Sequence, residues 1–434
     1  MTSIHELSDP LPIRPIHDPL DAVVEVPGSK SLTNRALLCA ALAAGRSRLT
    51  GVLFADDTEA MLGCIRGLGA TVDIDREGGV VEVIGTAGRL LNRSAALDAR
   101  QSGTTARFIA AVLLLSEDLS VLDADPQMRV RPMGPTFDAL RSLGATVDEI
   151  DAVGFLPARI RGTAHRSRPT VRLPGDLSSQ FISGLLLVAP CLAHGLRIEL
   201  STRAVSAPYL DMTVATMRAF GAVVDRSTDG VFVIEPGGYC STDHHIEPDA
   251  SAASYFFAAA AICGGRVRID GLGSSSIQGD VHFVDVLASM GAHVVVRSDS
   301  ITVTGGDLHG VSADFSDISD TAQTIAAVAA FATGSTRITG IGFIRAKETD
   351  RIAAVVTELE RCGVGAVQLE DGFEIHPAAI RPAVIETYDD HRMAMSFALI
   401  GLRSEGIEIA DPDCVAKTFP TFFDVLDSIR PEPT

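Results

Sequence analysis

Lysine is rare in this chain, which makes its few positions informative. Of the 36 lysine and arginine residues, only Lys30, Lys347 and Lys417 are lysine. An ε-ammonium is a compact, rotatable charge, whereas a guanidinium is a planar fork, and the two are not interchangeable at a binding site. We therefore take these three lysines as the first candidates for a site that binds a small anion.

A short polar motif precedes each of six apolar segments. The first is GSKSLTNR, which leads into ALLCAALAA, and the other five are RQSGTTAR, GDLSSQ, EPDASAAS, DISDTAQ and YDDHR. Hydroxyl and acidic residues there can cap the free amides of a helix. Capping does not explain Lys30, Arg35, Arg107, Gln180 and Arg392 at the same ends. Because helix N-termini also favour anions, the six ends together predict an anion-binding site.

Other charged residues extend this set. In the motif RAKETDR, we expect Lys347 and Arg351 to lie four residues apart on one helix face, which is unfavourable for like charges unless an anion lies between them. Glu348 stands beside them and could transfer a proton. We expect Arg131 in a loop and Lys417 before the last helix.

A recurring unit positions these motifs. A tag such as GLGATVD recurs at intervals of 70–77 residues, with its glycine at Gly69, Gly144, Gly221, Gly291 and, more loosely, Gly363. A glycine there suits the left-handed end of a helix, and the residues that follow suit a strand. The pattern predicts helix, strand, helix and two strands, repeated six times.

Six such units predict an α/β fold of two globular domains, each made of three βαβαββ-type units. We place one domain at 27–248 and the other at 1–26 plus 249–434, because the sixth unit lacks closing strands that the N-terminal stretch can supply. The expected architecture is a barrel-like six-fold repeat. Its buried helices would point their N-termini into a cleft between the domains.

The bulk properties restrict the class of protein. With 434 residues, 46% of them hydrophobic and 21% charged, the chain has a globular composition. A net charge of −19 argues against nucleic acid or an anionic membrane as a partner, although a local cluster of cations can still bind a small anion. No apolar run approaches the roughly 18 residues that span a bilayer, and a signal-peptide pattern is missing, so we expect a cytoplasmic protein.

Eight motifs occur in order along nearly the whole chain: PGSKSLTNR, SGTTAR, RPMG, LSSQF, SAPYLD, KETDR, DDHRMAM and AKTFP. Together they resemble the 5-enolpyruvylshikimate-3-phosphate synthase (3-phosphoshikimate 1-carboxyvinyltransferase) family. The resemblance implies transfer of the enolpyruvyl group of phosphoenolpyruvate to the 5-hydroxyl of shikimate 3-phosphate, with release of phosphate, in aromatic amino acid biosynthesis. It also implies an inverted pair of three-unit domains, of which 27–248 would bind mainly shikimate 3-phosphate and the other mainly phosphoenolpyruvate.

The resemblance also implies residue roles. Shikimate 3-phosphate would be bound by Lys30, Ser31, Arg35, Ser178, Ser179, Gln180, Ser206, Tyr209, Asp320 and Lys347. Phosphoenolpyruvate would be bound by Lys30, Gly103, Arg131, Gln180, Arg351, Arg392 and Lys417. Asp320 would be the general base, and either Glu348 or Lys30 would protonate the methylene carbon. Gly103 would leave the gap that close approach of glyphosate requires, so we expect inhibition by that compound.

The chemistry accounts for these residue types. Protonating the enol carbon creates oxocarbenium character at its neighbour, which the hydroxyl then attacks, so an acid and a base are needed in a dry site. Both substrates are polyanions, and a cationic site supplies binding and orientation together. The reaction requires neither a metal nor an organic cofactor. We expect a monomer that acts on these two small anions, without a nucleic-acid or membrane partner.

Two positions depart from the family pattern. The family commonly has asparagine at the places of Gln101 and Phe343. A phenylalanine at position 343 would remove a side-chain contact to the shikimate ring. We interpret both departures as local variation.

Two other functions are compatible with parts of this pattern. A transferase that moves the same group onto UDP-N-acetylglucosamine would share the fold, but its usual reactive cysteine is missing from the loop DADPQMRVRPMG, and its first motif lacks the SKSxTNR string. A non-catalytic anion-binding protein is disfavoured by Asp320 and Glu348, two carboxylates that stand among many cations.

The lysine argument can be tested at position 30. Lys30→Arg keeps the charge but replaces the compact ammonium by a planar fork, so we expect it to abolish turnover. The measurement is phosphate release from phosphoenolpyruvate with shikimate 3-phosphate as acceptor. Near-normal activity of the variant would remove the argument that an ammonium is needed.

Overall fold

The computed structural model describes residues 7–92, 94–163 and 168–431. The chain divides into two compact units. The continuous unit is Gly28–Glu247, and the split unit joins Met1–Pro27 to Pro248–Thr434. Residues 1–6 of the segment that we assigned to the split domain lie outside the described residues.

Three sheets of the continuous unit share one strand pattern: a parallel pair followed by an antiparallel hairpin. The strand orders with their bounds are β6 (Ala96–Asp98), β7 (Ser120–Asp123), β9 (Ala158–Arg161), β8 (Thr146–Glu149); β10 (Thr170–Leu173), β11 (Leu196–Leu200), β13 (Val231–Ile234), β12 (Val224–Asp225); and β14 (Tyr239–Cys240), β3 (Ala43–Thr50), β5 (Val80–Thr86), β4 (Thr71–Asp75). In the third sheet β15 (Asp243–His245) also pairs with β3 in parallel.

The split unit has three sheets of related order. They are β19 (Ser312–Asp314), β20 (Thr336–Thr339), β22 (Gly372–His376), β21 (Gly365–Leu369); β17 (His293–Val296), β18 (Ser300–Thr304), β16 (Gly265–Asp270), β2 (Leu20–Val23); and β1 (Leu11–Pro12), β24 (Ile407–Ile409), β23 (Ala383–Ile385). The N-terminal stretch thus supplies two strands: β2 pairs with β16 in parallel, and β1 pairs with β24 antiparallel. These pairs hold the stretch against elements more than 200 residues later in the chain.

The residue pattern explains these elements. Alternate residues of a strand face opposite sides, and in β5 the side chains of Val81 and Val83 are fully buried between less buried neighbours. The five tag glycines, at positions 69, 144, 221, 291 and 363, all have positive φ, as the sequence predicts for residues that end a helix and begin a hairpin strand.

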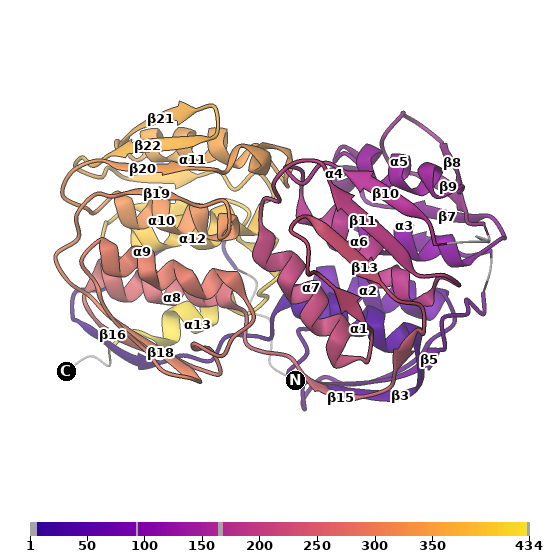
Figure 1. Ribbon diagram of the computed structural model, residues 1–434. Helices are drawn as coiled ribbons and strands as arrows, with labels where there is room; N and C mark the ends of the chain where they lie inside the picture. Colours follow the sequence, from indigo (N-terminus) through magenta and orange to yellow (C-terminus); the bar gives the residue numbers. More distant parts are fainter. Residues whose placement is uncertain (1–6, 93, 164–167, 432–434) are drawn as a thin grey trace. The chain divides into compact units, whose positions relative to one another are not determined.

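Six central helices carry the polar motifs. In the continuous unit they are α1 (Lys30–Leu42), α3 (Gly103–Val112) and α6 (Ser179–Val188), and in the split unit they are α8 (Ala250–Cys263), α10 (Ala322–Ala329) and α12 (His391–Gly401). Almost every residue of these helices is buried, so all sides of each helix face protein. In the split unit, the sheet strands lie outside α8, α10 and α12 (Figure 1).

More amphipathic helices accompany them: α2 (Asp56–Gly67), α5 (Gly134–Ser142), α7 (Ala207–Ala219), α9 (Phe283–Ser289), α11 (Arg351–Arg361) and α13 (Phe422–Ser428), with the single turn α4 (Pro126–Arg129). Short 3-10 helices complete the chain: η1 (Leu113–Leu115), η2 (Ala189–Cys191), η3 (Gly279–His282), η4 (Ser319–Thr321), η5 (Gly342–Ala346) and η6 (Pro412–Lys417).

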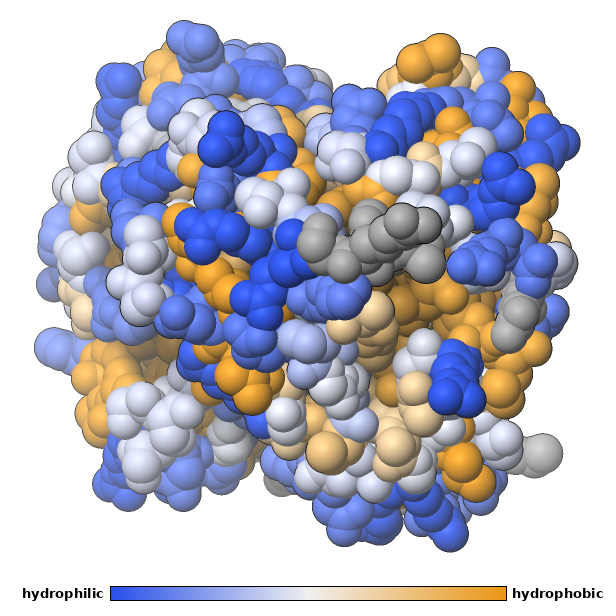
Figure 2. Space-filling model, turned by 45° about the vertical axis from the view of Figure 1, so that its right-hand side comes forward, coloured by the Kyte–Doolittle hydropathy of each residue, from blue (hydrophilic) through white to orange (hydrophobic). Residues whose placement is uncertain are grey.

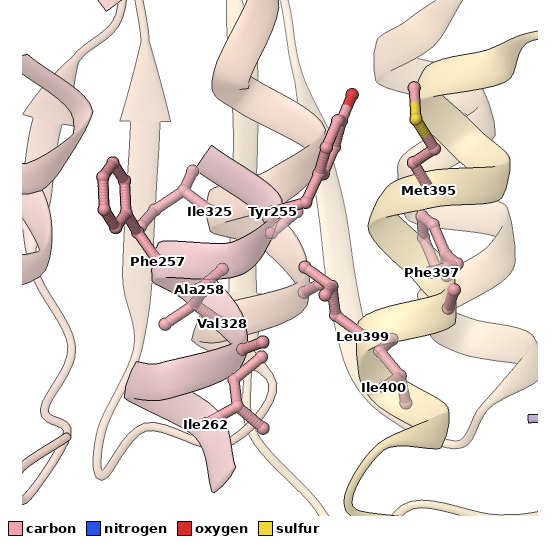
Figure 3. Packing of buried hydrophobic residues seen from close by; sticks show 14 of the residues in the cluster. Tyr255, Phe257, Ala258, Ile262, Ile325, Val328, Met395, Phe397, Leu399 and Ile400 are labelled. Atoms are coloured by element: carbon pink, nitrogen blue, oxygen red, sulfur yellow. The ribbon is translucent and has the colours of Figure 1, made fainter. Parts of the chain in front are cut away.

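The core of the split unit forms where α8, α10 and α12 meet. Figure 3 shows side chains from all three helices lying side by side, among them Ile262, Val328 and Leu399. The hydroxyl of Tyr255 lies at the end of the cluster away from Ile262 and is 3.5 Å from Nη1 of Arg392. At the N-terminal end of α12, the apolar core is therefore bordered by the charged guanidinium of Arg392.

Side-chain caps hold the starts of five central helices. Ser29, Ser102, Ser178, Asp249 and Asp390 each accept a hydrogen bond from a backbone amide in the first turn. The sixth helix, α10, instead follows the 3-10 turn η4 directly. The capping function predicted from the motifs is thus confirmed at five ends, and the charged residues beside the caps need a separate explanation.

The surface is mixed in character. Figure 2 shows hydrophilic and hydrophobic residues interspersed over the visible face. Singly exposed apolar residues, such as Val153 and Val130, are ordinary on folded proteins. Among the described helices, none is both long and apolar enough to cross a membrane.

Candidate active site

In the continuous unit, Lys30 is the first residue of α1 and forms an ion pair across to α2. Its Nζ lies 3.1 Å from Oδ2 of Asp57, whose side chain is buried. The backbone oxygen of Asp57 also accepts a hydrogen bond from the hydroxyl of Thr105 in α3. Asp57 therefore links the beginnings of α1, α2 and α3, a role that the sequence motifs did not reveal.

Arg35 joins α1 to α6 and α7. Its guanidinium donates to Oγ1 of Thr213 (2.8 Å), the backbone oxygens of Ser31 (2.8 Å) and Tyr209 (3.3 Å), and Oγ of Ser183 (3.3 Å). All four acceptors are uncharged. Burial lowers the pKa of Arg35 to about 10, because the charged form loses its hydration. An anionic ligand near this group would stabilise its charge.

A second group of side chains lies where α3 and α6 begin. Nη1 of Arg107 donates to the backbone oxygen of Gly103 (3.1 Å) and to Oε1 of Gln180 (3.0 Å). Nε2 of Gln180 donates in turn to Oγ1 of Thr104 at 3.3 Å. A Cβ atom at position 103 would lie 2.8 Å from Nη2 of Arg131, so this buried loop arginine lies against the same helix start. The structure thus brings Gly103, Arg131 and Gln180 together.

The predicted serines lie at helix starts of the same unit. Ser178 caps α6, and Ser179 is the first residue of that helix. Ser206 precedes α7 with a left-handed backbone (φ 51°) and is buried. Tyr209 lies in the first turn of α7, one turn before Thr213, the partner of Arg35.

In the split unit, Arg351 is surrounded by carboxylates. It donates from Nε and Nη2 to both oxygens of Asp390 (2.8 and 3.1 Å), from Nη2 to Glu348 (2.8 Å), and from Nη1 to Asp320 (3.4 Å). Burial by itself would lower the pKa of Arg351, but the charges of Asp390, Glu348 and Asp320 outweigh it and raise the pKa above its ordinary value. Arg351 therefore orients both predicted proton-transfer carboxylates.

Each of those two carboxylates has a second cationic contact. Nη2 of Arg392 lies 2.9 Å from Oδ2 of Asp320, and its Nη1 donates to the backbone oxygen of the same residue. Nζ of Lys417 lies 3.4 Å from Oε1 of Glu348. Five predicted site residues thus form one connected group, which we call the charged cluster: Asp320, Glu348, Arg351, Arg392 and Lys417.

Asp280, which no motif singled out, lies near this cluster. It is buried in η3 and forms a hydrogen bond with the hydroxyl of Ser251 in the first turn of α8. Burial is the largest cause that raises the pKa of Asp280 to about 7, and the negative charge of Asp320 adds to it, while Arg392 opposes it. Sequence gave no signal, because Asp280 is a single aspartate in a short turn.

The predicted placement of Lys347 is wrong in one respect. Lys347 follows η5, and α11 begins only at Arg351, so the two cations do not share a helix face. The reason is Asp350, which accepts hydrogen bonds from the amides of Ile352 and Ala353 and from Arg345, and so starts the helix there. Phe343 lies within η5 and packs in part against the core.

The fold and these two groups of side chains define a class: an α/β protein with buried, polar-capped helices, buried cations near several helix starts, and carboxylates paired with cations in the split unit. Among the described residues, no set of three or more His, Cys, Asp or Glu is arranged to hold a metal ion.

Comparison with known proteins gives the particular family. Residues 15–426 match the family model of EPSP synthase (3-phosphoshikimate 1-carboxyvinyltransferase). The chain is 43% identical to the 3-phosphoshikimate 1-carboxyvinyltransferase of Nostoc sp. over 417 residues, covering 96% of this chain and 98% of that one. It is 40% identical to the Aliivibrio salmonicida protein of the same name, over 96% and 99% of the two chains. An EPSP synthase structure from Acinetobacter baumannii superposes with a TM-score of 0.81 at 27% identity, covering 98% of each chain. The chain belongs to the EPSP synthase family.

Gly103→Ala tests the group around Arg107 and Arg131. The added Cβ would lie 2.6 Å from Nη1 of Arg107 and 2.8 Å from Nη2 of Arg131, so both guanidinium groups must shift. We expect a higher KM for phosphoenolpyruvate and weaker inhibition by glyphosate, measured from initial rates of phosphate release. Gly63→Ala is the matched control, because a Cβ there meets nothing within 4 Å. Unchanged inhibition in the Gly103 variant would contradict the placement.

The buried acid predicts a pH-dependent stability. A carboxyl group whose native pKa lies above its unfolded value destabilises the native state as the pH rises from the unfolded pKa to the native one. For Asp280 this window runs from 3.8 to about 7. The measurement is the melting temperature of Asp280→Asn minus that of the parent. We expect this difference to increase when the pH is raised from 5 to 7.5. The exposed Asp18→Asn serves as control, and a difference independent of pH for Asp280→Asn would refute the assignment.

Proposed function

We propose that this chain transfers the enolpyruvyl group of phosphoenolpyruvate to the 5-hydroxyl of shikimate 3-phosphate and releases phosphate. Membership of the family supports the reaction. The observation that carries the mechanism is Arg351, a single buried cation that contacts both Glu348 and Asp320. Because the Arg351 guanidinium contacts both carboxyl groups, it holds Glu348 and Asp320 at fixed positions. One of them can then act on phosphoenolpyruvate while the other acts on the attacking hydroxyl.

Shikimate 3-phosphate is assigned mainly to the continuous unit. Its phosphate is dianionic, and helix starts with free amides, hydroxyls and nearby cations bind such groups well. The starts of α6 and α7 offer Ser178, Ser179, Ser206 and Tyr209, while α1 offers Lys30, Ser31 and Arg35. Arg35 supports this assignment because its hydrogen bonds reach only uncharged oxygens, so its charge favours an anion nearby.

Phosphoenolpyruvate is assigned to two sets of residues. Gly103 and Arg131 would receive its phosphate, with Lys30 and Gln180 as further contacts, and Arg351, Arg392 and Lys417 would bind its carboxylate. Asp320 and Lys347 are assigned to the attacking hydroxyl. Gln180 supports this scheme, since its amide is already oriented by Arg107 and Thr104.

The charged cluster suggests how protons move. The carboxyl group of Glu348 is contacted by both Arg351 and Lys417. When the substrate carboxylate binds to these cations, it competes with Glu348 and raises the affinity of Glu348 for a proton. Glu348, or Lys30 in its place, then protonates the methylene carbon. The 5-hydroxyl attacks the neighbouring carbon and gives its proton to Asp320. Phosphate then leaves with the proton that Asp320 received, and one methyl proton returns to the group that donated it, which restores the vinyl group in the product and both side chains.

The finer architecture is part of this proposal. We propose that the chain contains six repeats of one structural unit. The strand order that the sheets share, a parallel pair next to an antiparallel strand, supports this. We also propose that the protein works in the cytoplasm as a monomer.

Phosphate release separates the candidate functions. Purified protein is incubated with phosphoenolpyruvate and either shikimate 3-phosphate, UDP-N-acetylglucosamine or no acceptor. We expect release only with shikimate 3-phosphate, and a loss of about 100-fold or more in kcat for Asp320→Asn and Glu348→Gln, in line with general acid–base contributions. Release with the UDP-sugar would favour the alternative transferase. Binding of both anions without release would favour a non-catalytic protein.

A further inference from the structure

The loop between β23 and α12 contains an unusual turn. Tyr388 and Asp389 are consecutive non-glycine residues with positive φ, 57° and 53°. The left-handed conformation is unfavourable for an L-residue, and a tyrosine lacks the short polar side chain that eases it for aspartate. Such a turn persists only when contacts around it hold it in place.

Glu358 of α11 provides such contacts at the start of the loop. Its side chain is fully buried, and Oε1 accepts a hydrogen bond from the Tyr388 hydroxyl at 2.7 Å. Oε2 accepts from the backbone amide of Glu386 at 3.1 Å and lies 3.0 Å from Nε of Arg361. Burial, with the charge of Glu358 adding to it, raises the pKa of Tyr388 to about 12, so the phenol keeps the proton that it donates.

Arg351 provides the contacts at the end of the loop. It binds both oxygens of Asp390, and Asp390 in turn caps α12 through the amide of Arg392 at 2.9 Å. Arg351 and Glu358 are seven residues apart in α11, which is close to two helical turns, so they face the same way. One face of α11 therefore holds both ends of the strained loop.

The loop position matters because it sets two substrate-binding cations. Asp390 fixes the guanidinium plane of Arg351 through a two-point contact, and it starts the helix that carries Arg392. A turn that relaxed at Tyr388 would displace Asp390, and with it both arginines. No motif pointed to Glu358, which lies in an ordinary amphipathic helix.

We propose that Glu358 and Tyr388 are positioning residues, which hold the 386–390 loop against α11 so that Arg351 and Arg392 are aligned for the phosphoenolpyruvate carboxylate. This inference rests on the proposed function. Neither residue touches the substrate in this scheme. Their main effect is on the affinity for phosphoenolpyruvate, because Arg351 and Arg392 bind its carboxylate in this scheme. A smaller effect on the chemical step follows from the contacts of Arg351 with Glu348 and Asp320.

Tyr388→Phe removes only the hydroxyl. A hydrogen bond to a charged acceptor contributes enough for about a tenfold effect, so we expect the KM for phosphoenolpyruvate to rise about tenfold. We expect a smaller fall in kcat, because Arg351 also contacts Glu348 and Asp320, and a change of less than about twofold in the KM for shikimate 3-phosphate. Glu358→Gln should raise the same KM, and the effect of the double variant should be smaller than the product of the two single effects, because both changes weaken the Tyr388–Glu358 contact.

Tyr239→Phe is the matched control. Its hydroxyl also makes a buried 2.8 Å hydrogen bond, to the backbone oxygen of Leu187 in the continuous unit. We expect it to lower the melting temperature without changing the KM for phosphoenolpyruvate. If Tyr388→Phe behaves in the same way, the contact is merely structural and the inference is overturned. If the parent protein releases no phosphate with shikimate 3-phosphate, the proposed function fails instead, which is a separate result.

Discussion

The ionic contacts of Arg351 are the interaction on which the split unit depends. A buried guanidinium is costly unless charged partners satisfy its donors, and here Asp390, Glu348 and Asp320 do so. Because the fork has a fixed shape, it also sets the positions of those carboxylates relative to one another. The start of α12 follows from the same contact, since Asp390 is its cap. Removing the side chain of Arg351, or the carboxylates that it contacts, would leave an uncompensated buried charge.

Arg35 of the continuous unit has different partners. It is as deeply buried as Arg351, yet its hydrogen bonds go to hydroxyl and carbonyl oxygens, and its pKa falls where that of Arg351 rises. Under the proposed function this contrast has a chemical meaning. A phosphate near Arg35 would stabilise the charge of its guanidinium, whereas a substrate carboxylate at Arg351 would compete with the carboxylates that Arg351 already contacts.

Much of the candidate site could be predicted from the sequence, because its residues lie in local motifs. Ser178 and Gln180 are two positions apart at the start of one helix, and a capping pattern reveals them without any knowledge of the fold. Lys347 and Arg351 show the limit of that method. Their spacing fits a helix face, but a competing cap, Asp350, starts the helix later. Asp57, Asp280 and Glu358 were missed because their partners are distant in sequence, so no local pattern marks them.

By itself the sequence determined the family, the helices with polar starts, and the glycines that end helices, since each depends on neighbouring residues or on period. Tertiary structure alone decided which charge contacts which. The Arg351–Asp390 pair spans 39 positions and the Arg392–Asp320 pair spans 72, and such pairs form only when helices pack. The pKa of Asp280 likewise follows from burial and from nearby charge, which are properties of the folded chain and not of its order of residues.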